Sequence, residues 1–338
     1  MCELLVWDSI AALRANSAAW WELWRRDPRA TPFQSPVWVI PWAEQFASRS
    51  SLHVLAAVCE QRLVALLPLF FYDGPAGRTG ALLGAGISDY LDVLVAPGAP
   101  SKAVAGIWER VLELAEHARL DWTDLPGGSP LIAFADGVPR PHGVCPRRLL
   151  PESNQDFGAS LPKWLWRNVR QGEARLRRAG GRLRRSVRTT LARDLEALFE
   201  LHGAEWRARG TPGVLASAEV RAFHRRAAES LLERGVLRLQ VAELDGRPIG
   251  VLLTLDSRDT SCIYTSGFDP AHARLNLGSV LIASAAEDAI ARGKRWLDFL
   301  RGAERYKYHW GAQDRRIFRL EQRSVSNRAA PLACHPQR

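Results

Sequence analysis

Apolar and polar positions repeat with two different periods along the second half of the chain. Short apolar runs with period-two alternation predict strands over 181–187, 236–244, 247–256, 260–267, 295–300 and 315–322. Longer runs with apolar positions three or four residues apart predict helices over 155–179, 191–208, 217–234 and 278–293. The Asp245-Gly246 pair between two strands is a strong hairpin signal. A three-strand meander, a helix and a following strand predict a mixed α/β sheet with one crossover connection.

The first half repeats this order. Strands are predicted over 3–7, 52–58, 62–71, 90–97 and 121–125, and helices over 9–26, 36–48 and 101–118. The hairpin sequence LAAVCEQRLVALL (55–67) aligns with QVAELDGRPIGVL (240–252). A repeat of this length predicts two similar domains, which also suits 338 residues. We place them at 1–150 and 151–326, with a basic linking helix at 155–180 and a flexible tail at 327–338.

Motifs for several other protein classes do not occur in the sequence. No GxGxxG follows a first strand, and there is no P-loop, G-x-S-x-G or HExxH. No apolar run approaches the roughly 20 residues that span a bilayer, and the N-terminus lacks a basic and apolar signal sequence. The five cysteines are scattered and include no CxxC pair. We therefore expect reduced thiols, no metal site and a cytoplasmic protein.

The positive charge of the chain is concentrated in one segment. Of the net charge of +10, residues 163–188 contribute +9, with ten Lys/Arg and one Glu. Such a segment is either a solvated helix face or the binding site of an anionic partner, either RNA or lipid headgroups. Trp164 and Trp166 within it could stack on bases.

Four blocks resemble a known family. GFDPAHARLNLGSVLIASAAEDAIARGKRWLDFLRGAERYKYHWGA (267–312), FQSPVWVIPW (33–42), GISDYLDVLVAPG (86–98) and AEWRARGTPGVL (204–215) are similar to landmarks of CelD/BcsL-type (BioF-like) acyltransferases. These belong to the GNAT superfamily. The resemblance implies two tandem GNAT-like domains, each with a mixed, mainly antiparallel sheet flanked by helices, as in the FemABX aminoacyltransferases, which use aminoacyl-tRNA. It also implies transfer from acyl-CoA or acetyl-CoA in envelope or polysaccharide biosynthesis.

The helix predicted to start near Gly278 is the expected phosphate-binding element, because helix N-termini attract anions. Arg274 precedes it, Gly278 would let a phosphate approach the backbone, and Ser279 adds a hydroxyl. The superfamily pattern Q/R-x-x-G-x-G/A is incomplete here, since Leu277 and Ser279 occupy both glycine positions counted from Arg274. A plain helix start explains the same residues.

The loop after strand 295–300 is the expected reaction loop. Glu304 is the preferred general base. Asp298 is either a buried carboxylate paired with Arg301 or a second base. Tyr306 or Tyr308 would protonate the leaving thiolate, and Lys307 and Arg301 would bind substrate. For the amine or hydroxyl acceptor, a small molecule or glycan, we expect contacts from Asp89, Tyr90, Asp92 and Trp206 in a cleft between the domains. Each of these residues also has an ordinary structural explanation.

Overall fold

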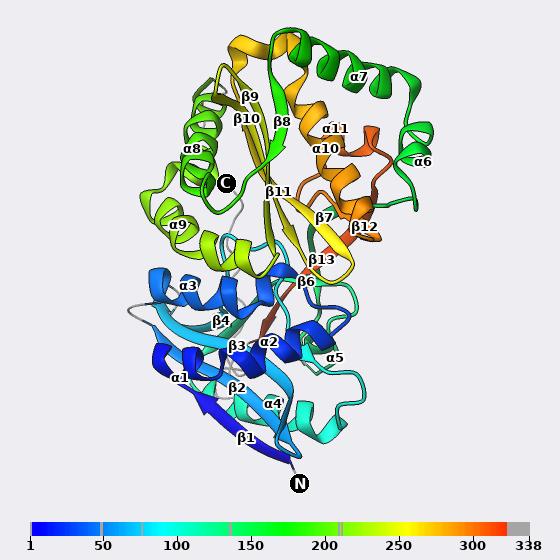
Figure 1. The fold of residues 1–338 in the computed structure, drawn as a ribbon. Helices are drawn as coiled ribbons and strands as arrows, with labels where there is room; N and C mark the ends of the chain where they lie inside the picture. Colours follow the sequence, from blue (N-terminus) through cyan, green and yellow to red (C-terminus); the bar gives the residue numbers. More distant parts are fainter. Residues whose placement is uncertain are drawn as a thin grey trace, which may run out of the picture. The chain divides into compact units, whose positions relative to one another are not determined.

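The computed structural model describes residues 2–47, 50–75, 77–134, 137–208, 210 and 212–322. The chain divides into two compact units (Figure 1). Unit 1 comprises the chain up to Arg29, Phe46–His142 and the chain from Ile317, and unit 2 comprises Ala30–Gln45 and Gly143–Arg316. The units are therefore not simply consecutive in sequence. The predicted tail at 327–338 lies outside the described residues.

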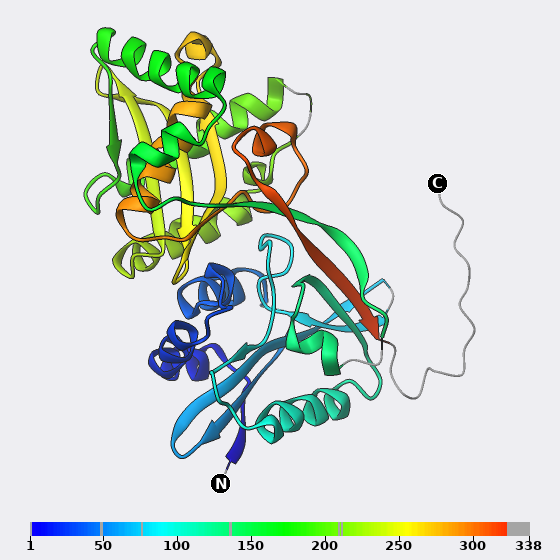
Figure 2. The same cartoon turned by 90° about the vertical axis from the view of Figure 1, so that its right-hand side faces the viewer.

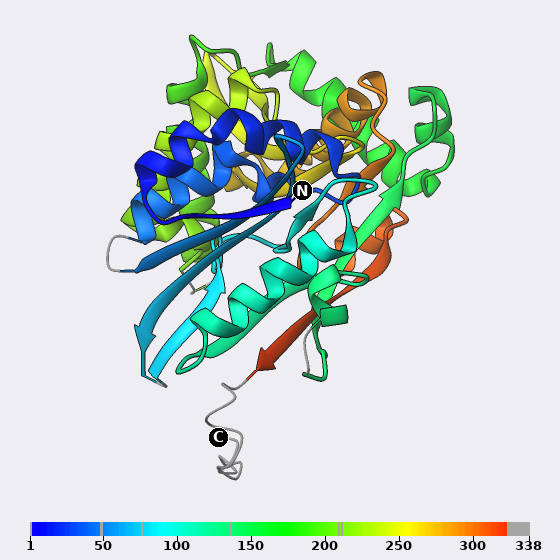
Figure 3. The ribbon, with the colours of Figure 1, turned by 90° about the horizontal axis from the view of Figure 1, so that it is seen from below.

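Unit 1 is built on a sheet with the strand order β1-β2-β3-β4-β6-β13. Neighbouring strands are antiparallel except β4 and β6, which are parallel and are joined through α4. Helix α4 covers one face of the sheet and α2 the other (Figure 3). The elements are β1 (Cys2–Trp7), α1 (Ile10–Ala15), α2 (Ser17–Arg26), β2 (Ser51–Cys59), β3 (Arg62–Gly74), β4 (Gly77–Leu82), β5 (Leu94–Val95), α4 (Ser101–Leu114), β6 (Arg119–Pro126), α5 (Pro130–Phe134) and β13 (Gln313–Gln322).

Unit 2 has the strand order β7-β12-β11-β10-β9-β8. Helices α8 and α9 lie on one face of the sheet and α7 and α10 on the other (Figure 1). The elements are η1 (Pro32–Gln34), α3 (Pro36–Phe46), β7 (Arg140–Leu149), α6 (Asn154–Ala159), α7 (Lys163–Arg178), β8 (Arg182–Arg185), α8 (Leu191–Ala208), η2 (Val214–Ala216), α9 (Ala218–Glu233), β9 (Leu237–Leu244), β10 (Arg247–Asp256), β11 (Thr260–Phe268), η3 (Pro270–Leu275), α10 (Leu277–Ala291), β12 (Trp296–Asp298) and α11 (Arg305–His309).

The two units share one topology, which confirms the predicted tandem α/β fold. In each unit a first strand is followed by helices, a three-strand meander, a crossover helix and a strand parallel to the third of the meander. The aligned hairpins also match in detail. Their turns are the left-handed pairs Glu60-Gln61, with φ of 50° and 61°, and Asp245-Gly246, with φ of 49° and 72°. Two successive residues with positive φ give the turn whose twist suits a two-residue hairpin.

Strands β7 and β13 connect the repeats in a way that the sequence did not predict. β7 follows the first repeat along the chain, but its residues pair with β12 in unit 2. β13 follows the second repeat, leaves α11 (Figure 2), and pairs with β6 in unit 1. Each sheet therefore receives its last strand from the other half of the sequence.

Several predicted element bounds needed correction. The strand expected at 90–97 is reduced to Leu94–Val95, and the third strand of the meander is β4. The helix expected at 155–179 is two helices, because Pro162 precedes the second and cannot continue the first. The helix expected at 9–26 is interrupted at Asn16.

Each unit has its own hydrophobic core. In unit 1, Trp108 of α4 packs near Trp122 of β6, with their ring centroids 6.3 Å apart. In unit 2, α7 and α10 contribute buried aliphatic side chains over the sheet. Each core is extensive enough to stabilise its unit by burial of apolar surface.

The expectation that all cysteines are reduced was wrong. Cys2 and Cys59 lie directly opposite each other on β1 and β2 and form a disulfide, with a Cα–Cα distance of 4.2 Å. Cys145 and Cys262 are free and buried, and Cys334 lies outside the described residues. Because disulfides are uncommon in reducing compartments, the cysteines give no support to the expected cytoplasmic location. Within the described residues, no helix has both the length and the apolar character to cross a membrane.

Candidate active site

Parallel strands β11 and β12 separate after a short contact and leave one strand edge open. β12 pairs with β11 only from Thr260↔Trp296 to Cys262↔Asp298. The chain then follows β7 instead, since the Phe299 N–H donates to the Pro146 carbonyl at 2.9 Å and the Gly302 N–H to Val144 at 3.0 Å. On that side, residues 263–268 of β11 have no strand partner among the described residues of unit 2. Ile263 and Phe268 face Thr254 and Gly250 of β10, which lie four residue steps apart, so this edge is about 14 Å long.

A bulge at Tyr264 accompanies the separation. In the β10–β11 register Leu253 faces Thr265 but Thr254 faces Ile263, so Tyr264 is the extra residue. A bulge bends its strand and increases the local twist. The ring of Tyr264 packs against Trp38 of α3 at a centroid distance of 5.4 Å and near His224 of α9 at 5.5 Å. Trp38, in the segment FQSPVWVIPW, therefore packs against β11 at the bulge.

Helix α8 lies very close to β11 because Gly267 has no side chain. A Cβ atom at this position would be 2.3 Å from the backbone nitrogen of His202. The Asp269 N–H donates to Ile249 of β10, so the alternate residues Ser266 and Phe268 point their backbone groups to the open edge. His202 reaches the same edge, with its Nδ1 3.0 Å from the Ser266 carbonyl. His202 is thus a structural contact of α8 at the candidate site.

The loop after β12 is held by two buried charged residues. Asp298 accepts a hydrogen bond from the Leu300 N–H at 2.8 Å, and Leu300 has a left-handed φ of 58°. Lys307 is 3% exposed and donates to the carbonyls of Leu300, Arg301 and Gly302 at 3.0, 2.8 and 3.1 Å. A non-glycine residue with positive φ is uncommon and persists where its surroundings enforce it. The loop therefore has a fixed and strained conformation.

This geometry argues against a substrate contact by Lys307 and favours the structural alternative for Asp298. Lys307 was expected to bind a substrate anion, but its ammonium is enclosed by loop carbonyls and also pairs with Glu304 at 2.9 Å. Asp298 is buried and orients the backbone of Leu300, which makes it a structural carboxylate of the loop. Both residues act on the shape of the loop. Arg301 is exposed at the same loop and remains a predicted substrate contact.

The three predicted acid–base side chains Glu304, Tyr306 and Tyr308 of this loop reach the surface. The Glu304 carboxylate is 57% exposed despite its ion pair with Lys307. Tyr306 is 44% exposed, and its ring packs edge-to-face on Phe299. Tyr308 donates to the Asp314 carboxylate at 2.8 Å, and this bond raises the pKa of its hydroxyl. Tyr306 is therefore the better placed of the two tyrosines for a role toward a ligand.

The helix α10 begins near the opposite end of the open edge. Asn276 precedes it with a left-handed φ of 51° and makes no side-chain capping bond. The first backbone N–H groups of α10, at Leu277, Gly278 and Ser279, therefore have no acceptor from a cap. Gly278 and Ser279 are half-buried, and a Cβ at Gly278 would only touch Phe268 at 3.5 Å. Arg274 is exposed, and its carbonyl accepts from Arg175 of α7 at 2.8 Å.

The residues expected to bind the acceptor have mixed outcomes. Tyr90 and Asp92 are buried within unit 1, and burial argues against direct contact with a substrate. Asp92 accepts from the Ser129 hydroxyl at 2.6 Å and from the Val93 N–H at 2.8 Å, and burial raises its pKa to about 7. Asp89 is half-buried, and its role stays a prediction.

Trp206 of α8 is half-buried and packs near His202, with ring centroids 5.7 Å apart. Its position on α8 places it near the helix face that contacts β11, and its predicted substrate contact remains untested. No group of three or more His, Cys, Asp or Glu side chains that could bind a metal ion occurs in the part of the chain that the structure describes.

The sequence reasoning missed Gly267 and the open edge. A lone glycine inside a strand signals a bulge or a close approach by another backbone, and TSCIYTSGF contains one. The separation of the two strands had no signal of its own, because the partner of residues 299–302 is the distant strand β7.

Comparison with known proteins identifies the class of the domain in unit 2. Residues 165–308 match the family model described as an acetyltransferase (GNAT) domain. Unit 2 carries a GNAT-type acyltransferase domain. The protein is therefore an acyltransferase. No curated protein sequence matches the chain.

Solved structures resemble the whole chain. FemX is similar with a TM-score of 0.70 and 11% identity over 94% of this chain and 96% of that one. The C-terminal domain of a putative lysylphosphatidylglycerol synthetase from Agrobacterium fabrum gives 0.58 and 10% over 93% of both chains. A tandem GNAT protein from the clavulanic acid biosynthesis pathway gives 0.52 and 18% over 96% and 99%. These likenesses establish the tandem GNAT-like fold.

Proposed function

We propose that the protein is a CelD/BcsL-type N-acyltransferase that moves an acyl group from acyl-CoA to an amine or hydroxyl acceptor. The observation that supports this most directly is the open edge of β11 between the reaction loop and the start of α10. A pantetheine arm carries amide groups, which can pair with the Phe268 backbone and the Ser266 N–H as a further strand would, whereas the Ser266 carbonyl already accepts from His202. The acceptor would be a small molecule or a glycan in envelope or polysaccharide biosynthesis.

The ends of the open edge would take the two ends of the donor. At one end, the uncapped N–H groups of α10 and the side chains of Arg274 and Ser279 suit phosphate oxygens. At the other, about 14 Å away along the strand, the loop carries Glu304 and Tyr306. With this separation, the phosphates and the thioester of one extended donor would lie at different elements of unit 2.

The reaction requires one bond to form and one to break. The acceptor nitrogen attacks the thioester carbonyl, its bond to carbon forms, and the carbon–sulfur bond breaks. Glu304 would take the proton from the nitrogen, and Tyr306 would give a proton to the departing sulfur. Lys307 fixes Glu304 in place through their 2.9 Å contact.

Release of free thiol from acetyl-CoA in the presence of pooled amines and amino sugars tests this proposal. Because a positioned general base typically contributes 10²–10⁴-fold, Glu304→Gln should lower turnover by at least about 100-fold. Glu152→Gln, an exposed carboxylate elsewhere in unit 2, is the matched control and should leave turnover unchanged. Thiol release by Glu304→Gln at the wild-type rate would remove Glu304 from the mechanism.

An aminoacyl-tRNA donor is the second candidate, favoured by the resemblance to FemX over nearly the whole chain. Coenzyme A at 100 times its Kd stabilises a binding protein by about 2.7 kcal/mol, which a thermal melt detects. A tRNA-dependent enzyme should show no such shift, release no thiol, and bind RNA with a steep salt dependence. If neither ligand changes the melting temperature, a non-catalytic protein that binds an anionic polymer becomes the better account.

A further inference from the structure

The outer face of α7 carries a dense row of cations. The helix buries Leu165, Val169, Gly172 and Leu176 against unit 2, and its basic side chains lie on the exposed side. Its exposed basic side chains are Lys163, Arg167, Arg170, Arg175, Arg177 and Arg178. With 16 residues, the helix presents this row over about 24 Å.

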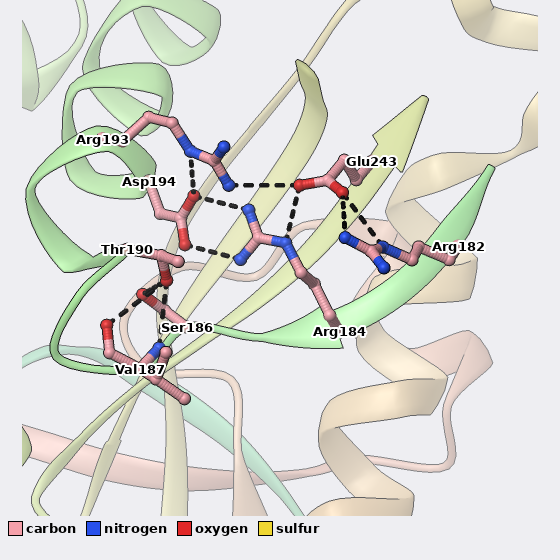
Figure 4. Close-up of polar contacts among 8 residues, drawn as sticks. All are labelled: Arg182, Arg184, Ser186, Val187, Thr190, Arg193, Asp194 and Glu243. Atoms are coloured by element: carbon pink, nitrogen blue, oxygen red, sulfur yellow. Dashed lines mark hydrogen bonds and ion pairs between the residues drawn. The ribbon is translucent and has the colours of Figure 1, made fainter. Parts of the chain in front are cut away.

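The basic residues after α7 are not part of this surface, because acidic side chains neutralise them. Arg182 and Arg184 both bind the buried Glu243, and Arg184 also forms a two-bond pair with Asp194 (Figure 4). Arg193 contacts the same two carboxylates. Arg185 pairs with Asp288, and Arg188 with Glu229 and Glu233. The basic segment of the sequence therefore separates into a structural network and the α7 face.

On the α7 face, Arg170 has an acidic partner within the described part of the chain, Glu173 at 3.0 Å. Among the described residues, Lys163, Arg167, Arg177 and Arg178 have no ion pair. The helix dipole favours Arg177 and Arg178 in the last turn. It disfavours Lys163 and Arg167, which lie in the N-terminal half without an acidic residue in the first turn. The intrinsic properties of the helix thus do not account for the row.

We propose that the outer face of α7 binds an anionic membrane surface. The face offers charge without an apolar stripe, because the apolar side of the helix is already buried in unit 2. Trp164 lies in the first turn, is 48% exposed, and contacts His309 edge-to-face at 5.1 Å. Tryptophan favours the headgroup level of bilayers. Single-stranded RNA is bound through several stacking rings in a groove, whereas Trp164 is the only exposed aromatic of α7.

Binding to vesicles tests the surface independently of any enzymatic activity. The assay measures sedimentation of the protein with liposomes. The liposomes contain phosphatidylcholine alone or phosphatidylcholine with roughly one third phosphatidylglycerol, and each is tested at low and high salt. Each cation near an anionic surface strengthens binding about fivefold. The triple variant Arg167→Gln, Arg177→Gln, Arg178→Gln should therefore bind the anionic liposomes about 100-fold more weakly.

The matched control loses the same charge elsewhere. Arg25→Gln, Arg62→Gln, Arg247→Gln removes three exposed arginines outside α7 and should bind as the wild type does. The triple Arg→Lys variant at 167, 177 and 178 should also bind normally, because lipid headgroups recognise point charges. The proposal would be overturned by an equal loss of binding in the control, or by wild-type protein that shows no preference for anionic liposomes. It would also be overturned if the Arg→Gln triple variant lost RNA binding but kept liposome binding.

Discussion

Replacing Lys307 by methionine removes the buried cation that holds the reaction loop. Three carbonyls at 2.8–3.1 Å lose their donor, while Glu304 loses its ion pair. A hydrogen bond to a charged group contributes about 1.5–3 kcal/mol, but two of these carbonyls are only partly buried and can bind water instead. We therefore expect the free energy of unfolding to fall by about 3 kcal/mol. For a unit of this size the Tm should fall by about 10 °C.

Calorimetry of the purified variant measures this change. Lys102→Met, at an exposed lysine in the first turn of α4, is the matched control and should stay within about 0.5 kcal/mol of the wild type. Because the loop also carries Glu304, acyl transfer should fall even at temperatures where the variant is folded. A Lys307→Met protein that melts with the wild type would show that the carbonyls do not depend on the ammonium.

The remaining predictions concern both units. Gly267→Ala should destabilise unit 2 by at least about 2 kcal/mol, since its Cβ would overlap α8. Gly106→Ala in α4 has open space around it and should stabilise unit 1 by about 0.5–1 kcal/mol. Equal melting temperatures of the two variants in a thermal scan would contradict this. Reduction of Cys2–Cys59, which spans 57 residues, should cost about 4 kcal/mol, and a melt unaffected by reductant would contradict it. Burial raises the pKa of Asp92 to about 7, so ionisation of this carboxyl opposes folding and the free energy of unfolding should fall from pH 4 to 7. Asp92→Asn should remove this slope. Parallel pH profiles of stability for the wild type and the variant would refute this prediction.

Local patterns in the sequence determined much of the fold. Helix α8 and strand β10 were predicted with their observed bounds, because apolar periodicity and hairpin turns depend on residues close together along the chain. Asp245-Gly246 is left-handed for the same local reason. The repeat and the α/β class followed from the order of these elements.

The tertiary structure decided which edges and charges remain available. The exchange of β7 and β13 depends on the choice of a distant partner, and this choice also separates β12 from β11 and opens the edge. Lys307 was expected to bind substrate, but the carbonyls of three loop residues enclose its ammonium. Arg184 and Arg177 belong to the same basic run, yet only Arg184 meets buried carboxylates. Sequence sets the residue types and local conformation, whereas solvent exposure and ion pairing depend on contacts between residues far apart in the chain.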